Sequence, residues 1–162
     1  MHGDLSFDLH ALTTRLDRSA DRILQAEFGL SYRRFLALLT VGELGAATQR
    51  ALAERLGVSE PSVSRMAGVL SEIGLLDSRI DPAGGNRRRL TLTKAGRQVV
   101  ESCRELLERR FAELVGRSGV SYTDYARDTT LLMEALDAAQ TPTKQARASP
   151  AASTSTAPRT RA

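Results

Sequence analysis

Residues 48–65 of this chain read TQRALAERLGVSEPSVSR, and this stretch decides the fold. Apolar residues recur at helical spacing on both sides of Gly57, which predicts two short helices joined by a tight turn. Pro61 falls in the first turn of the second helix, where its missing N–H group has no intrahelical partner to lose. Leu52 and Val63 would then pack the two helices against each other. The pattern is that of a helix-turn-helix.

The second helix of this motif would carry polar residues on the face turned away from that packing. Ser62, Ser64 and Arg65 lie in its first turns. Short hydroxyl side chains allow close approach to a groove, and an arginine can reach a guanine edge or a phosphate. These residues favour binding to duplex DNA. A corner of two amphipathic helices inside an ordinary helical domain is the alternative.

The periodicity before the motif predicts two further helices. Apolar residues at spacings of three, four and seven make residues 4–28 a long amphipathic helix that Gly29 can end. Ser31 can cap the second helix, which carries Phe35 and Leu38 on one face. Within the motif's second helix, capped by Ser59, we expect Val63, Met66, Leu70 and Ile73 to form the buried stripe.

After the motif, the sequence changes from helical to strand-like patterning. Residues 75–79 and 89–92 read as two short strands around the turn-forming segment 81–86, which predicts a hairpin with a polar tip. Thr93 can cap another long helix, and Ser121 can cap a last one. The predicted fold class is mainly α with a small β-hairpin.

Length and composition predict one globular domain over residues 1–139, with a lobe of about residues 47–93 as its DNA-binding part. A chain of 162 residues with 41% apolar residues can bury one compact core. Residues 140–162 contain no large apolar residue, so we expect a disordered basic tail there. The absence of an 18-residue apolar run and of a signal-like N-terminus predicts a cytoplasmic protein without a membrane segment.

Positive charge is concentrated where this interpretation needs it. Residues 47–98 contain nine basic and five acidic side chains, and residues 140–162 contain four basic side chains and no acidic one. A polyanion would be drawn to these two segments, which suits a DNA-contacting module placed between other elements.

The sequence offers no catalytic or metal-binding constellation. The single cysteine, Cys103, lies on the apolar stripe of its helix, which predicts a buried and inert thiol. His2 and His10 are the only histidines, and they do not form a metal-ligand spacing with that cysteine. We therefore expect no enzyme activity, no metal and no cofactor.

The order of these elements resembles the multiple-antibiotic-resistance regulators, the MarR family. The resemblance runs from about Leu5 to Leu136 and includes LSEIGLL at residues 70–76 and LTKAG at residues 92–96. It implies a winged helix-turn-helix whose terminal helices, about 4–28 and 94–139, interlace with those of a second subunit. It also implies that each recognition helix enters a major groove while each wing reaches a minor groove.

Carried over residue by residue, the resemblance assigns a candidate DNA-binding set. In the recognition helix these residues are Ser59, Pro61, Ser62, Ser64 and Arg65. Thr48 and Gln49, at the start of the preceding helix, are candidates for phosphate contact because free N–H groups there favour anions.

In the wing, the candidates are Arg87, Arg88 and Arg89, which can enter a narrow minor groove or hold phosphates. The wing also departs from the family. Where its members usually have an Asp followed by basic residues, this chain has Gly84, Gly85 and Asn86. A solvated basic turn is the alternative interpretation.

Similar proteins often hold small aromatic anions between the long helices and the DNA-binding lobe. Tyr32, Phe35 and Phe111 are the candidates for such a pocket, with plain core packing as the alternative. The function implied is a homodimeric repressor that binds a short inverted repeat and is released by a small aromatic or anionic effector. A sequence-tolerant architectural DNA-binding protein and a helical protein-interaction adaptor remain as alternatives.

Overall fold

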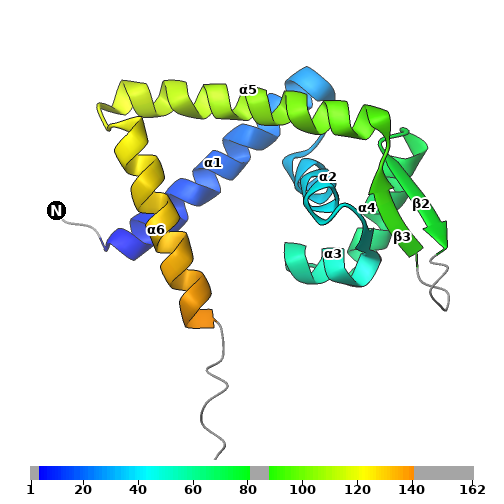
Figure 1. Cartoon of the computed structure of the whole chain (residues 1–162). Helices are drawn as coiled ribbons and strands as arrows, with labels where there is room; N and C mark the ends of the chain where they lie inside the picture. Colours follow the sequence, from blue (N-terminus) through cyan, green and yellow to red (C-terminus); the bar gives the residue numbers. More distant parts are fainter. Residues whose placement is uncertain (1–3, 81–87, 141–162) are drawn as a thin grey trace, which may run out of the picture. The chain divides into compact units, whose positions relative to one another are not determined.

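The computed structural model describes residues 4–80 and 88–140, and it confirms the predicted fold class. Its elements, labelled in Figure 1, are α1 (Leu5–Phe28), α2 (Tyr32–Leu44), β1 (Ala47–Thr48), α3 (Gln49–Leu56), α4 (Glu60–Glu72), β2 (Leu76–Ile80), β3 (Arg88–Leu92), α5 (Lys94–Ser118) and α6 (Tyr122–Gln140). The chain divides into two compact units after Leu114, and each is described by itself.

The sheet of the first unit has three strands where the sequence predicted two. The strand order is β1-β3-β2 and both pairings are antiparallel. The first predicted strand is shifted by one residue, the second begins one residue earlier than predicted, and β1 was missed entirely. Its two residues, Ala47 and Thr48, are too few to show an alternating pattern.

The strand register sorts side chains onto the two faces of the sheet. Thr48 pairs with Arg89, and Arg89 pairs in turn with Arg79, so these three residues form one row on one face. The neighbouring row contains Ala47 and the fully buried Leu90, so it faces the core. The arginines are therefore on the outer face of the sheet.

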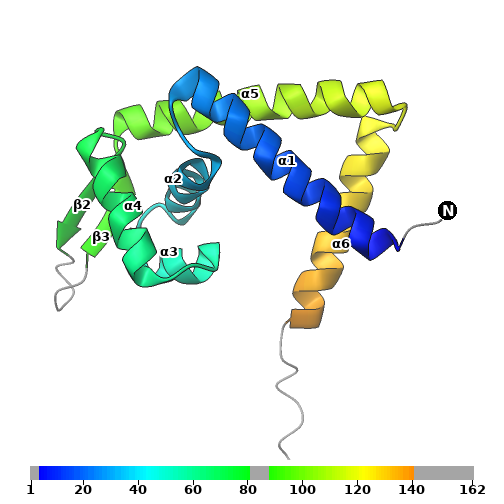
Figure 2. The same ribbon diagram turned by 180° about the vertical axis from the view of Figure 1, so that it is seen from behind.

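The core of the first unit joins the helix-turn-helix to the flanking helices and the sheet. Its largest fully buried apolar side chains are Leu24, Leu38, Leu52, Leu70, Leu90, Val41 and Val63. Each such side chain contributes about 1.5–3 kcal/mol by leaving water. Figure 2 shows α3 and α4 from behind, joined by a short turn. Gly57 has φ of 63°, a left-handed conformation that glycine adopts without a steric cost.

Two details of α4 differ from the sequence prediction. Ser59 occupies the N-cap position, but its side chain caps no backbone N–H group. Ile73 was expected on the buried stripe and is instead 55% exposed. The helix ends one residue before it, at Glu72, so Ile73 leaves the helical stripe that buries Val63 and Leu70.

A compact joint connects the end of α4 to the start of α5. The Thr93 hydroxyl donates to the carbonyl oxygens of Gly74 at 2.7 Å and Leu75 at 3.3 Å. The same hydroxyl oxygen accepts the Gly96 N–H group at 2.9 Å, and the Thr93 N–H group donates to the Leu75 carbonyl at 3.2 Å. The predicted cap at Thr93 is confirmed, and it also holds the turn after α4.

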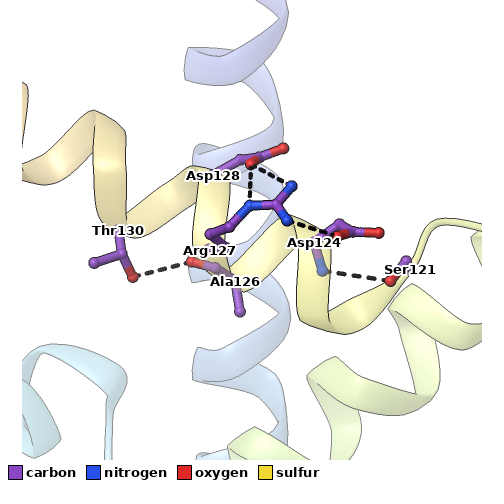
Figure 3. Close-up of polar contacts among 6 residues, drawn as sticks. All are labelled: Ser121, Asp124, Ala126, Arg127, Asp128 and Thr130. Carbon is purple, nitrogen blue, oxygen red and sulfur yellow. Dashed lines mark hydrogen bonds and ion pairs between the residues drawn. The ribbon is translucent and has the colours of Figure 1, made fainter.

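In the second unit, α6 is stabilised at its start by its own polar side chains (Figure 3). The Ser121 hydroxyl accepts the Asp124 N–H group at 3.3 Å, which confirms the predicted cap. Arg127 forms ion pairs with Asp124 at 3.0 Å and Asp128 at 3.1 Å. Further along, the Thr130 hydroxyl donates to a main-chain carbonyl one turn earlier at 3.0 Å.

Several helices expose large apolar side chains in the single chain, with the largest sets on α1 and α6. On α1 they include Leu5, Phe7, Leu9 and Leu12, and on α6 they include Leu131, Leu132, Met133 and Leu136. On α6 all four are more than half exposed. Exposed apolar side chains gathered on one element are typical of an interaction surface.

Candidate nucleic-acid interface

The start of α4 presents the predicted recognition residues to solvent. Pro61, Ser64 and Arg65 are exposed and Ser62 is half-buried. The Ser62 hydroxyl lies 2.9 Å from that of Ser59 and accepts a hydrogen bond from Arg65 Nη2 at 3.4 Å. The Ser59 hydroxyl, which does not cap the helix, therefore helps to orient Arg65 through Ser62. Packing of Val63 and Leu52 underneath fixes the backbone that carries this face.

Thr48 and Gln49 lie where β1 passes into α3. The Thr48 hydroxyl accepts the Ala51 N–H group at 3.1 Å, so it caps α3. Gln49 is half-buried. On the same helix, Arg50 is bound to Glu54 at 3.0 Å, and this hydrogen bond raises the pKa of the Arg50 guanidinium. Arg50 is thus engaged within α3, while the helix N-terminus retains the dipole that favours an anion.

The structure places Arg88 and Arg89 on β3, both exposed, while Arg87 and the glycine-rich tip lie outside the described residues. Arg79, which was not predicted from the sequence, lies directly across from Arg89. Arg79 is held by Asp77 of the same strand at 2.8 Å. Alternation could have placed Arg79 and Asp77 on one face, but only the register shows that Arg89 and Thr48 share it.

Of the three predicted pocket residues, Tyr32 lines a groove, and Phe35 and Phe111 are not among the lining residues of that groove. The rings of Tyr32 and Phe35 are stacked with centroids 6.1 Å apart, yet Phe35 is buried in the core. Tyr32 lines a groove of about 1060 Å³ at the junction of α1 and α2. Burial, and then the charge of Asp17, raise the pKa of the Tyr32 hydroxyl. Phe111 is half-buried on α5 and is not among the described residues that line this groove.

The groove that Tyr32 lines has a mixed but predominantly basic wall. Its charged lining residues are Arg15, Asp17, Arg18, Asp21, Arg22 and Arg33. Four guanidinium groups against two carboxylates give it a positive balance. Apolar side chains from α1 and α2, including Leu16 and Leu36, and Leu114 of α5 also line it.

Cys103 lies where the sequence placed it, in the core with no exposed surface. Burial raises the pKa of its thiol to about 11. Within the described part of the chain, no three His, Cys, Asp or Glu side chains lie together as metal ligands would. None of the described helices combines the length and apolar character that crossing a membrane requires.

A two-helix motif followed by a short antiparallel sheet, with long helices at either end, defines a winged helix-turn-helix protein. The MarR family model matches residues 28–89. An uncharacterised HTH-type transcriptional regulator of Mycobacterium bovis is 30% identical over 132 residues, which cover 82% of this chain and 92% of that protein. The chain belongs to the MarR family and is a transcriptional regulator.

Solved structures share the fold. Wild-type MarR of E. coli, in its apo form, superimposes with a TM-score of 0.74 at 20% identity, covering 84% of this chain and 98% of that one. A mutant of the same protein complexed with operator DNA gives a TM-score of 0.67 at 20% identity, covering 82% and 93% of the two chains. The resemblance inferred from residues 5–136 is confirmed at the level of family and fold.

Proposed function

We propose that the protein is a sequence-specific DNA-binding regulator whose α4 reads a major groove. The observation that carries this proposal is the exposed face at the start of α4, where Ser64 and Arg65 point away from a core fixed by Val63. An arginine on such a face can form two hydrogen bonds to a guanine edge. The E. coli relative that was crystallised with operator DNA supports the same use of the fold.

Contacts to the DNA backbone would come from the row of residues across the sheet and from α3. Thr48 and Gln49 lie at the N-terminus of α3, where an anion is favoured, and Arg88 and Arg89 extend along the wing. Arg79 joins them because it shares its face with Arg89. These side chains would position the protein on the duplex, while Arg65 reads the bases. Arg87 is assigned to the wing from the sequence alone.

The protein would act as a homodimer on a short inverted repeat. The exposed apolar side chains of α1 and α6 need a partner, and a second copy of the chain offers the same two surfaces. Two recognition helices about one DNA turn apart, roughly 34 Å, would read two half-sites. A dimer bound across a promoter would exclude RNA polymerase, so the protein would act as a repressor of nearby genes. It would do so in the cytoplasm.

The α1–α2 groove is the best-supported place for an effector. It combines the Tyr32 ring with apolar side chains and a positive charge balance, which suits a small aromatic anion. Phe35 and Phe111 drop out of this proposal because neither lines the groove. A ligand there would relieve repression only if it preferred a dimer with the wrong helix separation.

Replacing Arg65 by alanine tests the proposed base reading. A preferred duplex is first selected from a random pool, and binding is then measured on that duplex and on a scrambled one. We expect Arg65→Ala to weaken binding to the selected duplex by about 1–3 kcal/mol and to affect the scrambled duplex much less. Arg104→Ala, which removes an exposed arginine on α5, serves as the matched control.

Equal losses on both duplexes would assign Arg65 to a phosphate. Selection of no preferred sequence, with tight binding throughout, would identify an architectural DNA-binding protein. No binding to any duplex at low salt would contradict the proposed function and favour an interaction adaptor.

A further inference from the structure

A small groove lies between the start of α2 and the exposed face of α4, and we call it the α2–α4 groove. Its volume is about 250 Å³. The α2 side contributes Ser31, Arg33 and Arg34. The opposite side is formed by Val58 in the turn and by α4 residues Ser62, Arg65, Met66 and Val69. Two residues assigned above to DNA reading, Ser62 and Arg65, are therefore also one wall of this groove.

The α2–α4 groove is uniformly basic. Three guanidinium groups line it, and none of its described lining residues is acidic. Arg50 and Arg79, by contrast, each pair with a carboxylate, Glu54 and Asp77 respectively. Within residues 4–80 and 88–140, Arg33 and Arg34 form no ion pair. Like charges collected without a counter-charge favour an anionic partner.

Two main-chain N–H groups at the start of α2 are already hydrogen-bonded within the chain, so they would not hold an anion. The Tyr32 N–H group donates to Asp21 Oδ1 at 2.8 Å, and the Arg34 N–H group donates to the Ser31 hydroxyl at 3.3 Å. The N-terminus of α2 is thus already capped by side chains of the protein itself. What the groove offers an anion is the pair of side chains, Arg33 exposed and Arg34 half-buried.

We propose that Arg33 and Arg34 bind a backbone phosphate of the same duplex whose bases Arg65 reads. This inference rests on the proposed function. Duplex DNA carries one negative charge per about 1.7 Å of its axis, so bases read at one wall of the groove bring phosphates close to the other wall. The contact adds α2 to the DNA-binding surface, which the sequence analysis confined to residues 47–93.

The test is the salt dependence of DNA binding by the double variant Arg33→Ala/Arg34→Ala. Each phosphate contact contributes about 0.9 to the slope of log affinity against log salt, so a dimer that loses one contact at each half-site loses about 1.8. Between 50 and 200 mM salt, wild-type affinity should therefore fall about 12-fold more than that of the variant. The Arg33→Ala/Arg34→Ala variant should lose the same amount of slope on the selected and scrambled duplexes, because phosphates carry no sequence information.

Arg104→Ala/Arg109→Ala removes the same charge from exposed positions on α5 and should leave the slope almost unchanged. Arg33→Lys/Arg34→Lys keeps both charges and should restore most of the slope, because lysine also binds phosphate as a point charge. Thermal unfolding of each variant shows that it is folded.

A slope for Arg33→Ala/Arg34→Ala equal to that of the α5 variant would overturn the inference and leave the proposed function standing. A loss confined to the selected duplex would also overturn it, because the two arginines would then read bases. Failure of the wild-type protein to bind DNA would remove the proposed function itself.

Discussion

At the scale of single residues, Cys103 shows how burial determines chemistry. The thiol has no exposed surface, and its surroundings are apolar. The charged thiolate is disfavoured there, so the pKa rises to about 11 from an ordinary value of 9.0. Only the thiolate is a nucleophile, and the neutral form is therefore retained well above neutral pH.

We expect the folded protein to be almost unreactive toward a thiol reagent. A pKa raised by two units lowers the thiolate fraction at pH 8 about 100-fold relative to the unfolded chain. The measurement is the rate of modification at pH 8 with and without denaturant. A native rate close to the denatured rate would mean that Cys103 is accessible and open to oxidation.

The sequence predicted residue positions well where helical periodicity decides them. Val63 and Leu70 are buried and Arg65 is exposed, as their spacing required. Prediction from the sequence failed where the end of a helix, or a competing hydrogen-bond partner, determines what a side chain does. Ile73 is exposed because α4 ends before it, and Ser59 bonds to a neighbouring hydroxyl instead of a backbone N–H group.

At the scale of elements, the start of α5 depends on the absence of a side chain at Gly96. A Cβ atom there would overlap the carbonyl oxygen of Leu75, which is backbone and cannot rotate away. The LTKAG segment therefore has a physical explanation. Its threonine bonds the turn after α4, and its glycine lets α5 approach that turn closely.

Gly96→Ala should destabilise the protein by about 1–3 kcal/mol, because the joint must open to admit the methyl group. Gly116→Ala in the same helix meets nothing within 4 Å, so it should stabilise the protein by about 0.5–1 kcal/mol. Denaturant unfolding of the two variants provides the comparison. If Gly96→Ala were as stable as the wild-type protein, the joint would have room for a side chain and the explanation would be wrong.

The sheet marks the limit of prediction from sequence at this scale. The two strands β2 and β3 were recognisable from composition, but β1 and the pairing register were not. Register depends on hydrogen bonds between segments some forty residues apart in sequence, as Ala47 and Leu90 are. Arg79 was therefore missed, although the sequence places its ion-pair partner Asp77 two positions earlier. The sequence assigned candidate DNA-binding residues to α3, α4 and the wing, whereas the proposed contacts of Arg79, Arg33 and Arg34 depend on register and packing that sequence spacing does not give.

At the scale of the whole molecule, the exposed apolar side chains of α1 and α6 predict that the isolated chain associates. Leu132 and Leu136, one turn apart on α6, are 64% and 58% exposed. Replacing both by aspartate should yield monomers in analytical ultracentrifugation. Affinity for an inverted repeat should fall by roughly 100-fold or more, because the second half-site is no longer tethered.

Thr123→Asp/Thr130→Asp adds the same charge to the opposite face of α6 and should leave the dimer largely intact. Monomers already present in the wild-type protein would contradict the dimer proposal. Dimers that persist in the leucine variant would place the interface elsewhere.

The joint around the Leu75 carbonyl also has a mechanical consequence. The hydroxyl and N–H groups of Thr93, and the close approach at Gly96, join the end of α4 to the start of α5. Moving one helix end without the other would break hydrogen bonds worth about 0.5–1.5 kcal/mol each. We therefore expect a displacement at the start of α5 to move α4 with it, and with α4 the face proposed to read DNA.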